Sequence, residues 1–215
     1  PEAIVQAKAK PGARLRVAVA EGTTVWQVVE ALKQADFLEG QTGPLPSEGT
    51  LAPDTYEVAK GGSRRELIDR MRAAQDATLT AAWDARPFGL PYQTPEEALT
   101  MASIVEKETG IPEERRRVAA VFVNRLREGM RLQTDPTVIY GVTNGREVLD
   151  RGLRRSELDR KTPYNTYQID GLPPTPISSP GEASLEATLA PSTGDLLYYV
   201  LENADGTHFF TADYA

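Results

Sequence analysis

The chain has 215 residues, which is enough to bury one large or two small hydrophobic cores. Its formal net charge of −7 argues against a surface that binds nucleic acid, and the absence of cysteine excludes disulfides, zinc–thiolate sites and thiol nucleophiles. With a single histidine, His208, we expect neither a histidine-based catalytic triad nor a metal site built from several histidines, and we expect no cofactor. No stretch approaches 18 consecutive apolar residues, so no membrane-spanning helix is expected within this sequence.

Residues 1–55 are expected to form a first small unit. Residues 15–19 alternate apolar and polar side chains like a strand, Glu21-Gly22 form a turn, and residues 24–34 carry apolar side chains at helical spacing. This strand–turn–helix pattern is similar to LysM-like modules. Residues 40–53 are rich in Gly, Pro, Ser and Thr, so we interpret them as a connector to the rest of the chain.

Two long helices are predicted from periodicity and from their ends. After Ser63, apolar residues stand at helical spacing as far as Trp83. Residues 113–128 have acids in the first turn and arginines in the last, which the helix dipole favours, and Gly129 ends the pattern. Arg125, near that end, is expected to be a solvated surface charge.

A further helix between these two is marked at both ends. Thr94 can cap it, Pro95 suits its first turn, and Glu97 completes a Thr-x-x-Glu capping box. Gly110 is expected to stop it, and Pro112 follows two residues later.

Glu106 falls on an apolar side of this helix. On a helical wheel its side chain lies within an arc of apolar residues, whereas Glu108 points roughly 160° away. A carboxyl group in apolar surroundings has a raised pKa and can stay protonated near neutral pH, ready to donate a proton. An acid at the edge of the core that reaches water or pairs with an arginine would give the same pattern. Periodicity alone leaves both interpretations open.

Residues 130–180 hold much Pro, Gly, Thr, Asn and Tyr, and only brief regular segments are expected there. The candidate binding residues of this region belong to two clusters of hydrogen-bonding and aromatic side chains: Gln133, Thr134 and Asp135 in the first, and Tyr164, Asn165, Thr166 and Tyr167 in the second. A third cluster is the proline-rich loop over residues 171–180. Aromatic rings beside short polar side chains suit a sugar, which offers apolar C–H faces and hydroxyls. Polar side chains that only tie their own loops together would look the same.

The C-terminal part is expected to contain a short helix and a hairpin. The segment 179–182 repeats the capping-box signature and should start a helix that ends near Ala190. Residues 195–201 and 207–211 are predicted to be strands joined by a turn over residues 203–206. The fold class is therefore α+β. A small LysM-like β/α unit precedes a mixed α/β domain over residues 56–215, which carries the Glu106 helix and ends in the β-hairpin.

Several segments of this second domain resemble, in order, the signatures of one protein family, the membrane-anchored endolytic murein transglycosylases (the MltG, or YceG-like, family). The resemblance covers nearly all of residues 50–215, and the Leu-Gln-Thr-Asp-Pro-Thr run at 132–137 is its most specific part. Upstream, residues 49–56 resemble the family's Pro-Asp-Thr-Tyr segment, and residues 14–39 resemble its LysM-like subdomain. The segments that carry the match within the second domain are 102–108, 121–126, 130–141, 164–167, 171–174, 177–181 and 206–208.

The resemblance implies cleavage of the β-1,4 bond between N-acetylmuramic acid and N-acetylglucosamine inside peptidoglycan strands. The product would end in 1,6-anhydromuramic acid, and Glu106 would be the catalytic acid. One acid would suffice, because the muramoyl C6 hydroxyl is the nucleophile and lies within the substrate itself. Gln133, Thr134, Tyr164, Asn165, Thr166 and Tyr167 are candidates for holding the sugars.

Two other functions stay open. A hydrolase of the same glycan would use Glu106 with Asp135 as a second carboxylate, since ordinary glycosidases need two. If Asp135 is not catalytic, we expect it to order its own loop beside the sugar-binding residues. A non-catalytic peptidoglycan-binding protein would use the LysM-like unit for affinity and keep Glu106 as a structural acid.

The resemblance also implies partners and a location. The partners would be peptidoglycan glycan strands and the synthases that polymerise them, and not nucleic acid. The location would be the inner membrane, reached through a single-pass anchor outside these residues, with the catalytic domain on the extracytoplasmic side.

Overall fold

The computed structural model describes residues 4–6, 15–204 and 206–214, and within them the chain is α+β as predicted. None of the helices in these residues has the length and apolar character of a membrane span. The elements follow in this order: β1 (Ile4–Gln6), β2 (Leu15–Val19), α1 (Val25–Gln34), β3 (Leu38–Glu39), β4 (Thr55–Val58), β5 (Gly62–Ser63), α2 (Arg64–Asp84), α3 (Pro95–Glu108), the 3₁₀ turn η1 (Pro112–Glu114), α4 (Arg115–Arg127), α5 (Asp135–Thr143), α6 (Arg155–Leu158), α7 (Glu182–Leu189), β6 (Tyr198–Leu201) and β7 (His208–Thr211).

The first core lies between a small antiparallel sheet, α1 and the start of α2. The sheet has the order β1-β2-β4, with Val17 of β2 opposite Tyr56 of β4. Alternate residues of β2 and the apolar side of α1 bury their side chains there, and so do Leu67 and Met71 of α2. The boundary predicted at residue 55 lies within β4, and the start of α2, which packs into the same core, follows it in the chain.

The predicted connector contains no helix or strand over residues 40–54. It nevertheless contacts the start of α1, where Thr24 and Gln27 form a capping box. The carboxylate of Glu48 in the connector accepts the Val25 N–H at 2.7 Å. Burial raises the pKa of Glu48, against the effect of this hydrogen bond and those from Gly49 and Tyr140.

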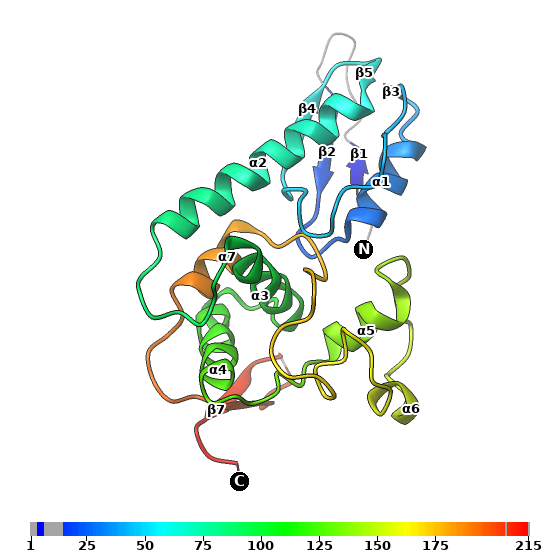
Figure 1. Ribbon diagram of the computed structural model, residues 1–215. Coiled ribbons are helices and arrows are strands. Elements are labelled where there is room, and N and C mark those ends of the chain that lie inside the picture. Colours follow the sequence, from blue (N-terminus) through cyan, green and yellow to red (C-terminus); the bar gives the residue numbers. More distant parts are fainter. Residues whose placement is uncertain (1–3, 7–14, 205, 215) are drawn as a thin grey trace.

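The second core surrounds α3, which packs against α2, α4 and α7 (Figure 1). Figure 1 shows the β1-β2-β4 sheet and α1 at one end of the molecule and this helical core at the other, with α2 extending from one to the other. Met71 of α2 belongs to the first core and Leu79, two turns further on, belongs to the second. One helix therefore contributes to both cores.

Arg125 differs from the expectation of a solvated charge, because it is 8% exposed. Its guanidinium donates to the carbonyl of Leu132 at 2.6 Å and to that of Leu197 at 2.8 Å. Burial lowers its pKa, and the neighbouring tyrosines and Glu108 act in the opposite direction. Arg125 thus connects the end of α4 to Leu132, two residues before Thr134, and to Leu197 at the start of the C-terminal hairpin.

Two other sequence predictions need correction, and a third lies partly outside the described residues. The helix expected over residues 113–128 is divided into η1 and α4. The capping box expected at Ser179 is not formed, because Gly181 is the N-cap of α7 and the Ser179 hydroxyl is buried without a hydrogen-bond partner in the residues described. The strands β6 and β7 pair as expected, although the turn predicted between them includes Asp205, which lies outside the described residues.

Candidate active site

Glu106 lies in the last turn of a helix that is buried around its whole circumference. Every residue of α3 from Ala98 to Val105 is buried. The start of the helix follows the prediction in part, because the Thr94 hydroxyl oxygen accepts the Glu97 N–H. The Glu97 carboxylate instead accepts the N–H of Gln93, one residue before the cap, so the box is not closed.

The carboxyl of Glu106 lies where the first unit meets the segment before α7. Glu106 is half-buried, and its Oε2 accepts the Gly181 N–H at 3.0 Å. The turn between β2 and α1 covers it from the other side, because Gly22 lies close to the Glu106 Cγ. This turn is fixed by two backbone hydrogen bonds to Ser179, and Lys107 Nζ donates to the Gly22 carbonyl at 3.2 Å.

Glu108 is the acid whose surroundings the helical wheel did not reveal. Because α3 is covered on all sides, the wheel does not distinguish a buried acid from an exposed one in its last turn. Burial raises the pKa of Glu108, while hydrogen bonds from the hydroxyls of Thr134 and Tyr199 lower it in part. Glu108 is thus a half-buried acceptor for the segment that precedes α5.

The Gln133-Thr134-Asp135 cluster forms the entrance to α5, a helix that the sequence analysis did not identify. Gln133 is exposed at φ 52°, and Thr134 is buried. The N–H groups of both residues donate to Thr166, one to its carbonyl and one to its hydroxyl oxygen. The signal for α5 was Pro136 near its start, since Pro favours the first helical turn.

Asp135 makes a side-chain hydrogen bond that links two segments of the site. Its Oδ1 accepts the Tyr167 hydroxyl at 2.6 Å, which joins the start of α5 to the Tyr164–Tyr167 turn. The carboxylate is exposed. Burial raises the pKa of Tyr167, and the Asp135 charge raises it further, so this hydroxyl stays a donor at neutral pH.

Within the Tyr164–Tyr167 turn, the two central residues hold the loop together. Asn165 is 0% exposed, and its Nδ2 donates to three backbone carbonyls, those of Glu157, Leu158 and Arg160. Thr166 is also fully buried against Thr137. The half-buried rings of Tyr164 and Tyr167 lie on either side of them. For Asn165 and Thr166 the structure therefore favours loop stabilisation over direct contact with a ligand.

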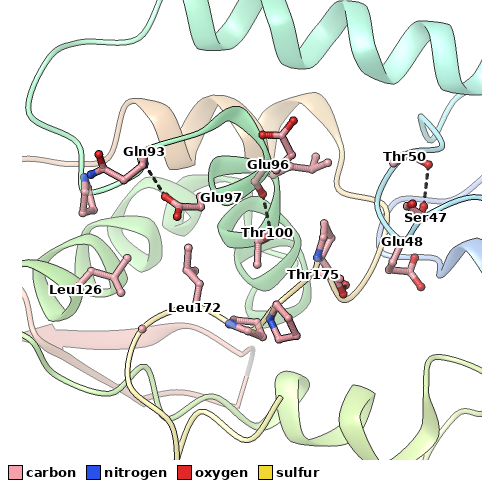
Figure 2. A pocket seen from close by; sticks show the side chains of 16 residues that line it. Ser47, Glu48, Thr50, Gln93, Glu96, Glu97, Thr100, Leu126, Leu172 and Thr175 are labelled. Carbon is pink, nitrogen blue, oxygen red and sulfur yellow. Dashed lines mark hydrogen bonds between the residues drawn. The ribbon is translucent and has the colours of Figure 1, made fainter. Parts of the chain in front are cut away.

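Two hollows flank this region. A hollow of about 260 Å³ lies between α1 and α5 and is lined by Gly22, Lys107 and Pro136. Gly22 lies close to the Glu106 Cγ and Lys107 is the next residue in α3, so the lining of this hollow includes two neighbours of the candidate acid. A hollow of about 630 Å³ lies between the connector, the start of α3 and residues 171–176 (Figure 2). Figure 2 shows Glu97 and Leu172 toward one end of that second hollow and Glu48 toward the other, with Thr100 and Thr175 between them.

Sequence reasoning missed one acid that belongs to this site. Glu21, in the turn over Glu106, has one carboxyl oxygen beside Gly181 and the other 3.9 Å from the Arg115 guanidinium. The sequence separates it from Glu106 by 85 residues, so no local pattern joins the two. Within the described residues, no group of three or more acidic or histidine side chains is arranged to hold a metal ion.

The family model described as "YceG-like family" matches residues 1–215, the full length of this sequence. The endolytic murein transglycosylase of Bacillus subtilis (strain 168) is 36% identical over 166 residues, which are 77% of this chain and 44% of that protein. The endolytic murein transglycosylase of Streptococcus pneumoniae serotype 2 is 32% identical over 164 residues, 76% of this chain and 29% of that protein. The chain therefore spans less than half the length of these two relatives.

A solved structure shares the fold. The crystal structure of a putative yceG-like protein from Listeria monocytogenes superimposes with a TM-score of 0.74 at 30% sequence identity. The superposition covers 92% of this chain and 73% of that one. Both the first unit and the helical core therefore have counterparts in a known structure.

Proposed function

This chain belongs to the YceG-like family, and from that membership and the surroundings of Glu106 we propose that it is an endolytic lytic transglycosylase of peptidoglycan. It would cleave the β-1,4 bond between N-acetylmuramic acid and N-acetylglucosamine within a strand and leave a 1,6-anhydromuramic acid end. The observation that carries the proposal is the position of Glu106, whose half-buried carboxyl accepts the Gly181 N–H and lies under Gly22, a residue that lines the hollow of about 260 Å³.

In the proposed reaction Glu106 acts first as an acid and then as a base. Its protonated carboxyl donates a proton to the glycosidic oxygen as the bond from C1 to that oxygen breaks. The resulting carboxylate removes the proton of the muramoyl C6 hydroxyl, whose oxygen forms the new bond to C1. Because acid and nucleophile belong to one complex, the second step has the advantage of high effective concentration. No water is consumed, so the products are two glycan fragments whose masses sum to that of the substrate.

The surroundings of Asp135 favour this one-acid reaction over the hydrolase. An inverting or retaining glycosidase needs a second carboxylate that is free to activate water or to attack C1. The Asp135 carboxylate is bound to the Tyr167 hydroxyl and stands at the start of α5. We therefore assign it to loop order, together with the buried Asn165 and Thr166. The exposed Gln133 and the rings of Tyr164 and Tyr167 are the proposed sugar contacts.

The decisive experiment is mass spectrometry of muropeptides after incubation of purified peptidoglycan with the wild type and with Glu106→Gln. We expect anhydro-ended fragments from the wild type and a loss of about 10²–10⁴-fold in the variant, the usual contribution of a general acid–base group. Glu113→Gln, an exposed acid of η1, is the matched control and should cleave like the wild type.

The alternative functions predict other outcomes. Fragments with reducing ends would establish hydrolysis and would make Asp135 a catalytic candidate again. Binding of peptidoglycan without cleavage by the wild type would favour the binding-module function. Equal cleavage by the wild type and Glu106→Gln would refute the role proposed for this acid.

The setting of the enzyme in the cell is part of the same proposal. The family resemblance supports an inner-membrane protein with its catalytic domain on the extracytoplasmic side, where nascent glycan strands emerge. The LysM-like character of the first unit is proposed on the same ground. Peptidoglycan synthases are the proposed protein partners, since an enzyme that ends growing strands must act near the machinery that extends them.

A further inference from the structure

The segment over residues 177–181 is bound to α3 at two neighbouring positions of the helix. Gly181, at the end of the segment, donates its N–H to Glu106 Oε2 at 3.0 Å. Ile177, at its start, donates its N–H to the hydroxyl oxygen of Ser103 at 2.9 Å. Because Ser103 precedes Glu106 by three residues, the two side chains project from the same side of α3. One segment therefore contacts both of them.

The Ser103 hydroxyl uses both of its hydrogen-bonding functions. It donates to the Thr100 carbonyl, one turn earlier in α3, at 2.7 Å, and it accepts from Ile177. The backbone carbonyl of Ser103 also accepts the hydroxyl of Ser178 at 3.3 Å. Ser103 and Ser178 are both 0% exposed, so solvent does not compete for these hydrogen bonds. Ser103 thus holds the start of the segment through its side chain and its backbone.

The middle of the segment is held from the opposite side, by the turn between β2 and α1. The Gly22 N–H donates to the Ser179 carbonyl at 2.9 Å, and the Ser179 N–H donates to the Thr23 carbonyl at 2.8 Å. These bonds attach the segment to the first unit and not to α3. Within the described residues, the hydrogen bonds between α3 and this segment come from Ser103 and Glu106. Ser103 is therefore the polar contact that sets the segment against α3 independently of the proposed acid.

We propose that Ser103 is a positioning residue for the cleavage reaction, which holds residues 177–181 against α3 so that the Gly181 N–H stays on the Glu106 carboxyl. Ser103 is buried and reaches no substrate, so it acts through Gly181, and the assignment rests on the proposed function. A general acid must come within hydrogen-bond distance of the oxygen that it protonates. Gly181 binds Oε2 of Glu106, and no donor among the described residues binds Oε1, which is left for the glycosidic oxygen.

A second buried serine provides a matched control. Ser184 of α7 is also 0% exposed, but its hydroxyl is buried without a hydrogen-bond partner in the part of the chain that the structure describes. Ser103→Ala and Ser184→Ala each remove one hydroxyl from the packed interior. Of the two, only Ser103→Ala leaves the N–H of Ile177 unpaired. A difference between the variants therefore reports the bond to Ile177 and not the loss of a buried hydroxyl as such.

The first test is kcat and KM for the cleavage of soluble, uncross-linked peptidoglycan strands. Ser103→Ala should lower kcat roughly 10- to 100-fold and change KM by less than about 2-fold, because a displaced acid slows the reaction while the sugar contacts stay in place. Ser184→Ala should match the wild type in both. Ser103→Cys keeps a weak acceptor for the Ile177 N–H and should have an intermediate kcat. A wild-type kcat in Ser103→Ala, or in Ser103→Cys if Ser103→Ala is unfolded, would overturn the proposal.

A second measurement does not depend on cleavage. The backbone amide signal of Gly181 is recorded by NMR in the wild type and the variants, and Glu106→Gln gives the direction in which the signal moves when its hydrogen bond is weakened. We expect Ser103→Ala to move the signal in that direction and Ser184→Ala to leave it in place. An unmoved signal in Ser103→Ala would refute the positioning role even if this variant is inactive. A moved signal in a protein whose wild type cleaves nothing would instead refute the proposed function and leave the contact intact.

Discussion

At the scale of single residues, the two acids in the last turn of α3 have different surroundings. The Glu106 carboxyl is half-buried and bound by a backbone N–H, whereas Glu108 is bound by the hydroxyls of Thr134 and Tyr199. Burial raises the pKa of Glu108, so the folded protein holds this proton over a pH range in which the unfolded chain has lost it. The stability gained in this way is fully present below the unfolded pKa of about 4.3 and is lost as the pH rises through the folded pKa.

Glu108→Gln removes this proton linkage while leaving a side-chain oxygen that can accept from Thr134. We therefore expect its thermal unfolding midpoint to fall less steeply than that of the wild type as the pH rises from about 4 to about 7. Calorimetry or circular dichroism across this range provides the measurement, with Glu113→Gln as control. Parallel curves for the wild type and Glu108→Gln would contradict the assignment. Cleavage by Glu108→Gln should fall far less than cleavage by Glu106→Gln.

At the scale of elements, the C-terminal hairpin is attached to α4 through polar groups as well as through its aromatic side chains. The Glu114 carboxylate, just before α4, accepts the backbone N–H of His208 at 2.8 Å and pairs with its ring nitrogen at 2.7 Å. Burial would raise the pKa of Glu114, but the hydrogen bonds and charge of His208 outweigh it and leave the pKa lowered. Arg125 holds the same hairpin at the other end of α4, through the Leu197 carbonyl.

The lowered pKa of Glu114 predicts an acid-sensitive attachment. The stability that it contributes is present above the unfolded pKa of about 4.3 and is lost as the pH falls through the folded pKa. Glu114→Gln should therefore lower the thermal unfolding midpoint at pH 7, and the difference from the wild type should shrink below about pH 4. Thermal scans at several pH values measure it, and a difference that stays constant with pH would contradict it.

The sequence predicted those helices that have capping or stop residues at their ends and apolar residues at helical spacing. Thr94, Ser63 and Gly129 begin or end helices where the sequence analysis placed these boundaries. The helix α5 was missed because its first turn coincides with a cluster of polar residues that resembles a loop. The Ser179 capping box was wrong because the backbone of Ser179 pairs with the β2–α1 turn, a contact that local sequence does not encode.

For the candidate site too, the sequence identified candidate residues by type and motif position but could not give their surroundings. Glu106 and the exposed Gln133 follow from residue type and motif position. The buried state of Asn165, Thr166 and Arg125 depends on segments that meet only in the folded chain. Glu21 was beyond reach for the same reason, since its neighbours Gly181 and Arg115 are far from it in sequence.

At the scale of the whole molecule, the candidate site is a product of how the two cores meet. The Glu21–Thr23 turn reaches the second core at Ser179, and the hydroxyl of Thr24 donates to the Gly145 carbonyl beyond α5. The Tyr140 hydroxyl donates to Glu48 of the connector at 3.1 Å. These contacts come from different elements, and Gly22, Thr24, Tyr140 and Gly145 line the same hollow of about 260 Å³.

The shared helix α2 has a consequence for how the molecule unfolds. Its 21 residues extend over about 30 Å, and one half belongs to each core. If either core melted alone, its half of α2 would lose packing while the other half stayed helical, which disfavours a partly unfolded intermediate. We expect a single cooperative transition, with coincident midpoints for the fluorescence of Trp26 in α1 and of Trp83 in α2, each measured after replacement of the other tryptophan by Phe. Separate midpoints would show that the cores melt independently. Coincident midpoints would mean that damage to β2 is felt at Glu106, more than 80 residues away in the chain.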